Sequence, residues 1–292
     1  MSAPVLVTGA SGNVGRPIVA GLLAAGVPVR AATRSAGDAV PAGVEHVALD
    51  VCDRSTWGRA LDGVRTMFLL RPPDMSDVRR DLIPMVEQGR ERGLEHVVFL
   101  SLQGAERNRV VPHAKVEGWL RQSGLGWTFV RPSFFMQNLS TTHRRDVAAG
   151  RLVVPAGDGR TAFVDTLDVA DVAVEALRDP ARHAGSAWTP TGPEALTYAE
   201  VTAQLSAVLG RTVVYTRPGA LTYALHARRE LGMPRGMVAI TTAIYTVARL
   251  GLAAGLTDDV RAVTGHPPRS FLEFARREAS TWQEDRQKDG AR

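Results

Sequence analysis

Val5-Leu-Val-Thr8, followed by Gly9-Ala-Ser-Gly12-Asn-Val-Gly15, is the stretch that decides the fold. An apolar strand runs into a glycine-rich turn, and the turn runs into a helix with Pro17 in its first turn, where a missing N–H costs little. The glycines permit a tight turn and let backbone N–H groups approach a pyrophosphate at the positive end of the helix. Their spacing differs from the GxGxxG of many dehydrogenases. The predicted cofactor-binding residues of this turn are Gly9, Ser11, Gly12, Asn13, Val14 and Gly15.

Short apolar runs alternate with helical patterns through the first two-thirds of the chain. Strands are expected at Val5–Thr8, Val29–Thr33, Val44–Leu49, Thr66–Leu70, His96–Ser101 and Trp127–Arg131. Helices are expected at Pro17–Ala25, Ser55–Leu61, Met75–Arg92 and Pro112–Gln122. Unbroken apolar strands separated by helices predict a parallel sheet covered on both faces. The fold class is therefore α/β, with a Rossmann-type NADP-binding domain over residues 1–150.

The pattern changes from Phe134 onward. Helices are expected at Val169–Leu177, Tyr198–Leu209, Ala220–Leu231, Met237–Ala254 and Ser270–Trp282, and short strands at Ala187–Pro190 and Thr212–Thr216. We expect residues 151–292 to form a mixed region that completes the sheet and builds a smaller, mostly helical substrate-binding cap. Ligands of open α/β sheets bind at the carboxyl ends of the strands, where this cap is expected. The short polar tail Gln283–Arg292 has the composition of a disordered end.

Composition and charge exclude several other classes of protein. Apolar residues at 45% and charged residues at 22% are ordinary for a globular chain of 292 residues, and the formal charge of +5 is spread rather than clustered, so no nucleic-acid partner is expected. A single cysteine, Cys52, excludes an intrachain disulfide, and no metal site is expected. The most apolar long stretch, Met237–Leu256, contains Arg249 and indicates a buried or pocket-lining helix rather than a membrane span. We expect a cytoplasmic protein without a membrane partner, either a monomer or a homodimer.

A cation follows the second expected strand, at Arg34. An NAD site usually has a carboxylate here for the ribose hydroxyls, whereas the 2′-phosphate of NADP needs a positive charge. Val29–Ser35 contains no carboxylate, and the guanidinium fork of Arg34 suits a phosphate, so NADP(H) is the predicted cofactor. The alternative is an ordinary surface arginine. Asp50 is positioned to accept from the adenine amino group, or else Asp50 or Asp53 caps the next helix.

Several motifs together resemble the NmrA-like group of atypical short-chain dehydrogenase/reductases. They are Gly9-Ala-Ser-Gly-Asn-Val-Gly15, Arg30-Ala-Ala-Thr-Arg34, Ser101-Leu-Gln-Gly-Ala105, His113-Ala-Lys-Val-Glu117, Trp127-Thr-Phe-Val-Arg-Pro-Ser-Phe-Phe-Met-Gln-Asn138, Asp165-Thr-Leu-Asp-Val-Ala170, Thr191-Gly-Pro-Glu-Ala-Leu-Thr197 and Thr264-Gly-His-Pro-Pro-Arg269. The resemblance spans nearly the whole chain but is not specific for a substrate. It implies either an NADPH-dependent reductase of quinone, azo or imine-type compounds, or a regulator that binds the dinucleotide without turning it over.

The resemblance also identifies candidate catalytic residues. The wider superfamily uses a serine and a Tyr-x-x-x-Lys, in which the tyrosine protonates the carbonyl oxygen and the lysine holds the nicotinamide ribose. Lys115 occupies the lysine position, but the residue four before it is Val111, so the usual phenol is missing. Ser101 ends the fifth strand and can hydrogen-bond a ligand, although serines commonly end strands. His113 can supply a proton near neutral pH, or it is a structural histidine.

Other residues are expected to line the cofactor and the substrate. Leu70 and Arg71 follow the fourth strand, where similar proteins line the ribose and nicotinamide of the cofactor. Asp165 and Asp168 are read as helix-capping or domain-joining residues. Phe134 and Phe135 are candidate substrate-binding side chains, and core packing is the alternative for both. Tyr223 and Tyr245 are further candidates for substrate binding, and either is a candidate replacement for the missing acid.

The missing phenol restricts the chemistry. Hydride transfer needs proximity and a polarised acceptor more than a nucleophile on the protein. An unactivated ketone would lose roughly 10²–10⁴-fold in rate without its general acid, whereas a quinone, iminium ion or conjugated carbonyl accepts hydride readily. We therefore expect an NADPH-dependent reductase of a small apolar or aromatic, electron-poor acceptor. The alternatives are a catalytically silent NADP(H)-binding regulator with an exposed apolar patch for a protein partner, and non-redox chemistry on a biosynthetic intermediate.

Overall fold

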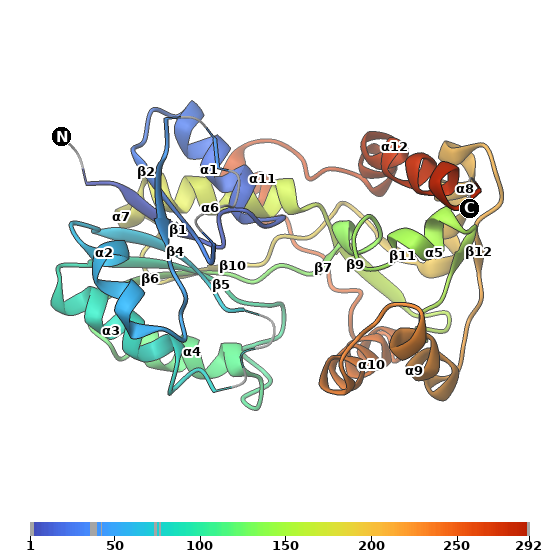
Figure 1. Ribbon diagram of the computed structural model, residues 1–292, viewed down its shortest axis with the longest axis horizontal. Helices are drawn as coiled ribbons and strands as arrows, with labels where there is room; N and C mark the ends of the chain where they lie inside the picture. The colour runs from blue at the N-terminus through green and yellow to red at the C-terminus, as the bar shows by residue number, and fades with distance from the viewer. Residues whose placement is uncertain (1–2, 36–39, 42, 73–74, 76, 291–292) are drawn as a thin grey trace. The chain divides into compact units, whose positions relative to one another are not determined.

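The computed structural model describes residues 3–35, 40, 41, 43–72, 75 and 77–290, and they divide into two compact units (Figure 1). Unit 1 comprises Met1–Pro132, Thr166–Pro190 and Asp259–His266, and unit 2 comprises Ser133–Asp165, Thr191–Asp258 and Pro267–Arg292. The boundary predicted at residue 150 falls inside unit 2. A single boundary does not describe this chain, because it returns to unit 1 twice after first leaving it.

Unit 1 is built on one sheet of seven strands, in the order β10-β6-β5-β4-β1-β2-β3. The strands are β1 (Val5–Thr8), β2 (Val29–Thr33), β3 (Glu45–Ala48), β4 (Thr66–Leu70), β5 (His96–Leu100), β6 (Gly126–Val130) and β10 (Ser186–Trp188). All pairs are parallel, and Val5 on β1 lies opposite Val29 on β2 and Thr66 on β4. The predicted α/β class and the Rossmann-type parallel sheet are thus confirmed.

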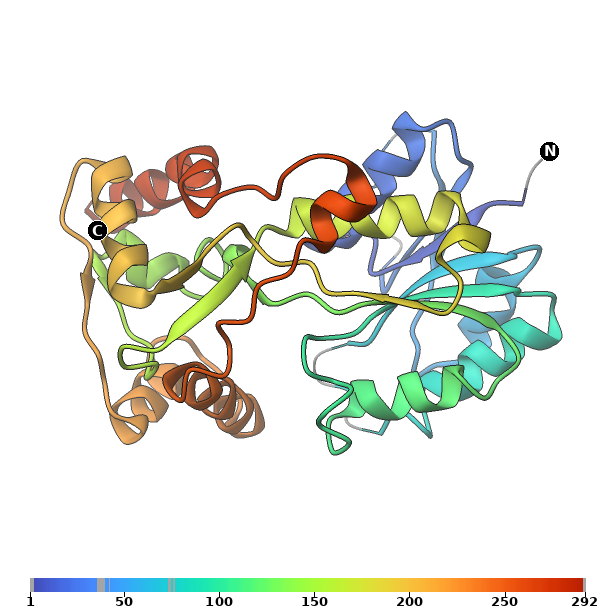
Figure 2. The same ribbon diagram turned by 180° about the vertical axis from the view of Figure 1, so that it is seen from behind.

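Helices cover both faces of this sheet (Figures 1 and 2). One face carries α1 (Gly15–Ala24), α6 (Thr166–Arg178) and α11 (Asp259–Thr264); the other carries α2 (Trp57–Leu61), α3 (Leu82–Glu91) and α4 (Pro112–Leu120). Two shorter helices, η1 (Arg54–Thr56) and α7 (Pro180–His183), complete unit 1. Helices α1 and α6 approach closely at Gly21, where a Cβ would lie 2.9 Å from a methyl carbon of Val174.

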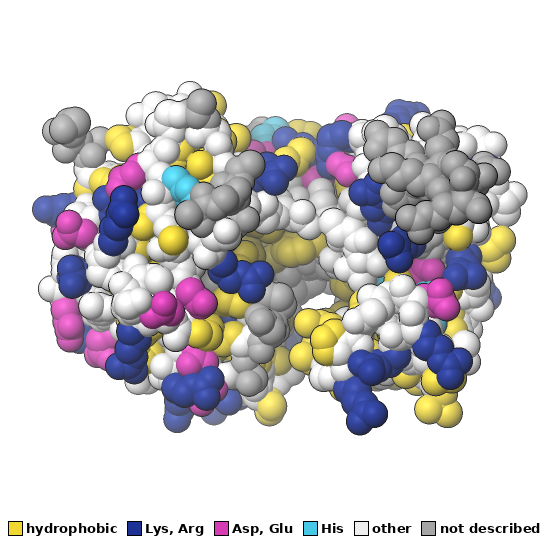
Figure 3. Space-filling model, viewed as in Figure 1, with side chains coloured by type: hydrophobic (Ala, Val, Ile, Leu, Met, Phe, Trp, Pro, Cys, Tyr) yellow, Lys and Arg dark blue, Asp and Glu magenta, His cyan; other side chains and the backbone are white. Residues whose placement is uncertain are grey.

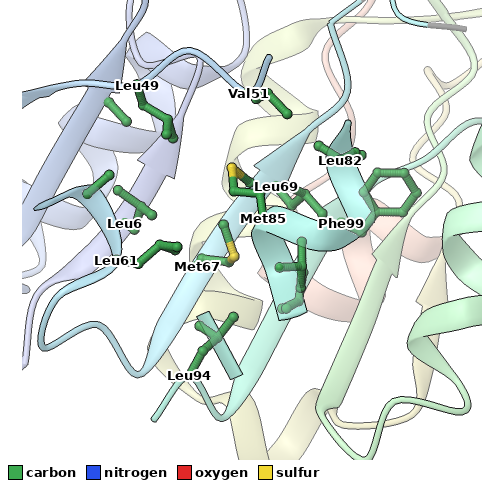
Figure 4. Close-up of a cluster of buried hydrophobic side chains, with 14 of the residues drawn as sticks. Leu6, Leu49, Val51, Leu61, Met67, Leu69, Leu82, Met85, Leu94 and Phe99 are labelled. Atoms are coloured by element: carbon green, nitrogen blue, oxygen red, sulfur yellow. The ribbon is translucent and has the colours of Figure 1, made fainter. Parts of the chain in front are cut away.

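The core on the α2–α3–α4 face explains why the strands are apolar without alternation. Every residue of β1 and β5 is buried, because helices cover both sides of the sheet. Figure 4 shows Leu6, Met67, Leu69 and Phe99 from the sheet among side chains of α2 and α3. Each such side chain contributes about 1.5–3 kcal/mol through removal from water.

Unit 2 combines short strands with helices. A three-stranded sheet has the order β11-β9-β7, with β7 (Phe134–Phe135), β9 (Arg160–Val164) and β11 (Ala195–Thr197), and β8 (Arg151–Leu152) pairs with β12 (Val214–Tyr215). The helices are η2 (Met136–Asn138), α5 (Arg144–Ala148), α8 (Tyr198–Leu209), α9 (Ala220–Arg229), α10 (Arg235–Arg249) and α12 (Phe271–Gly290). This is the mostly helical region that the sequence predicts. No described helix is both long enough and apolar enough to cross a membrane.

Several elements differ from their predicted bounds, and two differ by seven residues or more. The helix predicted from Met75 begins as α3 at Leu82, because residues 78–81 form turns, and the Asp81 N–H donates to the Asp77 carbonyl. Helix α12 continues to Gly290, through a tail predicted to be disordered. Residues 276–289 contain no Gly or Pro and many good helix formers, which outweigh the polar composition.

Candidate functional site

The candidate residues of unit 1 gather at the carboxyl edge of its sheet. Gly9 follows β1, Arg34 follows β2, Arg71 follows β4 and Ser101 follows β5. Strand β1 lies between β2 and β4, so the order of the strands reverses beside Gly9. Such a reversal opens a crevice at the carboxyl ends of the strands, where ligands of open α/β sheets bind.

The glycine-rich turn is closed by its own backbone. The N–H of Gly12 donates to the carbonyl of Gly9 at 3.0 Å, and Gly9 has a φ of 64°, in the region that favours glycine. A Cβ on Gly15 would lie 2.1 Å from the Gly9 oxygen. A side chain at Gly15 is therefore incompatible with this turn.

Helix α1 follows the turn directly, and the positive end of its dipole is not offset by an acidic side chain in its first turn. The first turn of a helix leaves N–H groups without partners inside the helix. Val14, at the N-cap, has no polar side chain, and the first turn holds Arg16 and no acidic residue. The Arg16 guanidinium donates to the Ser11 carbonyl at 3.3 Å. This edge is suited to a phosphate, and Arg16 is a cation that our prediction omitted although its place in the first turn was visible in the sequence.

The turn after β2 presents Arg34, whose side chain is exposed. The Thr33 hydroxyl holds this turn, since it donates to the Ser35 carbonyl at 2.7 Å and lies 2.7 Å from Nε2 of His46. His46 is a neighbour that the sequence did not reveal, because the contact joins two strands.

The two acidic candidates after β3 both bind backbone N–H groups. A carboxylate oxygen of Asp50 accepts from Cys52 N–H at 2.8 Å. Asp53 is the N-cap of η1, where its carboxylate accepts from the hydroxyl and the N–H of Ser55, and these bonds lower its pKa. The capping alternative therefore describes Asp53, while Asp50 stabilises the turn before it and remains exposed.

Leu70 and Arg71 extend β4 beside the turn. The Leu70 N–H donates to the Thr8 hydroxyl at 2.8 Å, and that hydroxyl donates to the Phe68 carbonyl at 3.0 Å, which ties the ends of β1 and β4 together. The Leu70 side chain lies against Gly9, 3.4 Å from the place of a Cβ there. The backbone after β4 is therefore held next to the glycine-rich turn.

Arg71 and His113 form the second feature of this edge. Arg71 donates through Nη1 to the carbonyls of Pro72 and Met75, and its Nε lies 3.4 Å from His113 Nε2. Because arginine only donates, Nε2 must accept, and this assigns the ring proton to Nδ1. Burial and the Arg71 charge lower the pKa of His113 to about 4. The imidazole is thus neutral at neutral pH and does not carry an acidic proton of an imidazolium ion.

Lys115 lies on another side of α4. The helix begins at Pro112, after Val111 in extended conformation, and Lys115 is exposed while the His113 ring is mostly enclosed. Positions two apart on a helix point in nearly opposite directions. Lys115 and His113 are therefore not presented on one helix face.

Ser101 is bound into a buried ion pair. Its hydroxyl donates to Glu117 Oε1 at 2.6 Å, and Arg131 donates to both oxygens of Glu117 from Nε and Nη2, at 2.9 and 2.6 Å. Arg121 adds a fourth contact at 3.0 Å. Burial alone would raise the pKa of Glu117, but the bonds from Arg131 and Ser101 outweigh it and keep the pKa below its ordinary value. The Ser101 hydroxyl thus uses its proton in the hydrogen bond to Glu117. Glu117 is not among the residues predicted from the sequence.

The aromatic candidates belong to the core of unit 2. Phe134 and Phe135 are partly buried, and the Phe134 ring lies 5.8 Å from the Tyr245 ring between centroids. The buried Tyr223 hydroxyl donates to Thr241 Oγ1 at 2.8 Å. Tyr245 is buried, which raises its pKa well above the ordinary value. Its phenol therefore keeps its proton.

The Tyr245 hydroxyl begins a chain of buried polar groups in unit 2. It lies 2.7 Å from Nε2 of His143, and His143 Nδ1 lies 3.7 Å from Asp146 Oδ2. The same carboxylate oxygen lies 2.7 Å from Nε2 of His226 on α9. Burial would raise the pKa of Asp146, but the two histidines outweigh it and lower the pKa. This network joins α5, α9 and α10.

The remaining acidic candidates are buried. Asp165 accepts from the amide of Gln137 at 2.7 Å and pairs with Arg277 at 2.6 Å, all within unit 2. Asp168 is buried in the first turn of α6. Among the residues described, no three His, Cys, Asp or Glu side chains are grouped so as to hold a metal ion.

The chain is similar to known proteins that are named for NAD(P)H or solved with NADPH or NADP. The model of the NmrA-like family matches residues 1–238. The NAD(P)H azoreductase of Xenophilus azovorans is 36% identical over 290 residues, which cover 95% of this chain and 99% of that protein. An Escherichia coli NADPH-dependent quinone oxidoreductase, solved with NADPH, superposes with a TM-score of 0.79 at 22% identity and covers 93% of this chain and 98% of its own. NmrA, a negative transcriptional regulator solved with NADP, gives 0.77 at 18% identity, with coverages of 99% and 98%.

Proposed function

Since the chain belongs to the NmrA-like family, we propose that it is an NADPH-dependent reductase of a small apolar or aromatic, electron-poor acceptor. The observation that carries the proposal is the edge of unit 1 where the Gly9–Gly15 turn, the uncapped start of α1 and the exposed Arg34 follow β1 and β2. A diphosphate suits the turn, and a 2′-phosphate suits the guanidinium of Arg34.

The chain's own residues then divide the work of cofactor binding. The rigid Gly9–Gly15 turn presents backbone N–H groups, Arg34 selects the 2′-phosphate, and Lys115 holds the nicotinamide ribose as an exposed cation on α4. Asp50 accepts from the adenine, and Leu70 and Arg71 line the ribose and nicotinamide side. NADPH supplies the hydride when it is bound.

The acceptor class follows from the groups that this edge lacks. Val111 stands where the phenol would be, His113 is neutral, and the Ser101 proton is held by Glu117. Hydride transfer to an iminium carbon gives a neutral amine that needs no proton, and transfer to a quinone or a conjugated carbonyl gives a delocalised anion that water can protonate. Such an acceptor does not depend on a strong acid from the protein, which favours quinones, iminium ions and conjugated carbonyls.

The experiment combines binding with turnover. NADPH and NADH are titrated into the protein by calorimetry, and NADPH oxidation is then followed with a quinone, an iminium salt, a conjugated carbonyl and an unactivated ketone. We expect tighter binding of NADPH than of NADH, and Arg34→Ala should weaken NADPH by about 10- to 100-fold, as expected for hydrogen bonds to a charged group, without changing NADH. Arg65→Ala, an exposed arginine after α2 in unit 1, is the matched control.

A catalytically silent regulator is the second candidate, and the absent phenol at Val111 is the observation that favours it. It predicts the same tight NADPH binding with no oxidation by any acceptor of the panel. Failure of both dinucleotides to bind would reject both functions.

A further inference from the structure

The outer face of α10 is apolar and uncovered. Ile240, Ile244, Val247 and Leu250 are exposed, and their spacing of four, three and three residues places them on one side of the helix. The opposite side, with Tyr245, belongs to the core of unit 2. Helix α10 therefore has two apolar sides, of which only the inner one is packed.

The exposed apolar side chains are concentrated in this part of the chain. Ten large apolar side chains are exposed among the residues described, and eight of them lie between residues 221 and 256. The most exposed of these eight are Leu221 (84%), Leu252 (72%) and Leu250 (67%). We call these eight residues the α9–α10 face: Leu221, Leu225, Ile240, Ile244, Val247, Leu250, Leu252 and Leu256. Single exposed apolar residues are ordinary, but a concentration marks an interaction surface.

Helices α9 and α10 hold this face together. The Tyr223 ring of α9 lies edge-on to the Tyr245 ring of α10, with centroids 5.4 Å apart, and the Tyr223 hydroxyl donates to Thr241. The inner sides of both helices are thus fixed by buried contacts. The outer apolar side chains are consequently held out by a rigid pair of helices.

The stretch of sequence that carries the α9–α10 face has many more basic than acidic residues. Between Glu200 and Asp258 the chain has one acidic residue, Glu230, and six arginines: Arg211, Arg217, Arg228, Arg229, Arg235 and Arg249. Arg228 and Arg229 lie seven and eight residues after Leu221, so they share the exposed side of α9 with it. Figure 3 shows hydrophobic and Lys/Arg side chains next to each other over the region in which Figure 1 draws α9 and α10.

We propose that the α9–α10 face docks peripherally on an anionic phospholipid bilayer. Asp158 lies beside Arg249 at the end of α10 and pairs with Arg217 at 2.9 Å, so it and Glu230 are the carboxylates found near this face. Apolar side chains flanked by more arginines than carboxylates match the boundary between acyl chains and anionic headgroups. A second copy of the chain is a poorer occupant, because a two-fold contact would bring two sets of arginines together with fewer carboxylates, Glu230 and Asp158, to offset each set. The expectation of no membrane partner rested on the lack of a spanning segment, which peripheral docking does not need.

Docking is separate from the proposed reductase activity, but it gives that activity a source of substrate. Apolar quinones and other conjugated acceptors partition into bilayers. A reductase held at the bilayer surface meets them at a higher local concentration than in water.

Vesicle flotation of the whole chain tests the docking. We expect binding to vesicles of phosphatidylcholine mixed with phosphatidylglycerol, weak binding to phosphatidylcholine alone, and loss of binding at high salt. Arg229→Gln and Arg235→Gln should each weaken binding about fivefold, which corresponds to about 1 kcal/mol per arginine near the surface. Leu250→Ser with Leu252→Ser should weaken it at least as much.

Matched controls separate docking from folding and from the proposed function. Val110→Ser replaces a side chain of unit 1 that is 82% exposed, and Arg65→Gln removes an exposed arginine of unit 1. Both should leave vesicle binding unchanged, and all variants should keep the NADPH affinity of the unaltered chain. Equal binding to both kinds of vesicle, or none to either, overturns the proposal. So does a dimer in sedimentation that Leu250→Ser with Leu252→Ser dissociates, since the face would then belong to a second copy.

Discussion

The Nε of Arg71 lies 3.4 Å from Nε2 of His113, and this contact fixes the proton of the imidazole on Nδ1. In the folded protein the pKa of His113 is lowered to about 4, first by burial and then by Arg71. The unfolded chain therefore binds a proton at His113 between pH 6.5 and 4 that the folded chain does not. Stability is expected to fall as the pH drops through this window.

His113→Gln removes this proton uptake. The loss in free energy of unfolding between pH 7 and pH 4 should be smaller in the variant by on the order of 3 kcal/mol. Urea unfolding at the two pH values measures it. His266→Gln, at a partly exposed histidine paired with Asp171, is the control, and an unchanged pH dependence in His113→Gln would contradict the assignment of a neutral ring.

The neutral ring also makes a kinetic prediction. With a quinone acceptor, kcat should be constant between pH 5.5 and 8, because His113 does not change its charge there. A kcat that falls through pH 6.5 and becomes flat in His113→Gln would mean that His113 donates the proton.

The glycines of the first turn predict a graded series of alanine variants. A Cβ would lie 2.1 Å from the Gly9 oxygen at Gly15 and 3.3 Å from it at Gly12, and it would meet nothing within 4 Å at Gly118 in α4. We expect Gly15→Ala to abolish NADPH binding and lower Tm, and Gly12→Ala to weaken binding only partly. Gly118→Ala should raise stability by about 0.4–1 kcal/mol. Calorimetry with NADPH and thermal unfolding rank the three, and equal effects at Gly12 and Gly15 would argue against the turn geometry.

Ser101→Ala separates a structural role from a catalytic one. Losing the bond from Ser101 to the Glu117 carboxylate should cost about 1.5–3 kcal/mol of stability. If that bond is the whole role of Ser101, kcat stays unchanged. A fall in kcat of roughly 10²–10⁴-fold would instead make Ser101 a participant in proton transfer. Ser123→Ala, which removes a buried hydroxyl bound to the Leu120 carbonyl, is the matched control for stability.

Asp146→Asn tests the buried network of unit 2. Its folded pKa lies below 3.8, so Asp146 stabilises the protein above that pH and loses this contribution as the pH falls through the folded value. At pH 7 the variant should be less stable by about 1–3 kcal/mol, because His226 loses a charged acceptor. Its stability should then change less on acidification than that of the unaltered chain. Asp158→Asn, at an exposed aspartate paired with Arg217, should show neither effect.

The local sequence pattern predicts the strands and helices of unit 1 but not which side chains contact one another. The strand–turn–helix from Val5 onward and the five further strands are legible because each is a short apolar run between breakers. The partners of His113 and Ser101 are not, since Arg71 lies 42 residues from His113 and Glu117 lies 16 residues from Ser101. Such contacts depend on which strands become neighbours.

Unit 2 was less predictable for a different reason. Strands β7, β8 and β12 have two residues each, too few to show alternation. The exposed side of α10 was also hidden, because its apolar residues read like those of the buried side. Of the predicted buried or pocket-lining helix over Met237–Leu256, the side of α10 that carries Tyr245 is buried and the side that carries Ile244 is exposed.

Strand β10 is made late in synthesis, although it belongs to the sheet of unit 1. Its residues Ser186–Trp188 close the sheet by pairing with Thr128–Val130 of β6, and the Arg131 N–H donates to the Trp188 carbonyl. Until the ribosome has made residue 188, β6 is an open edge of apolar backbone, and such edges invite pairing with other chains. The intervening stretch from Ser133 to Asp165 belongs to unit 2, so a growing chain must carry an unfinished second unit before it can seal the first. A fragment that ends at residue 150 lacks β10 and also α6, which covers one face of the sheet, so we expect it to keep that edge open and to aggregate.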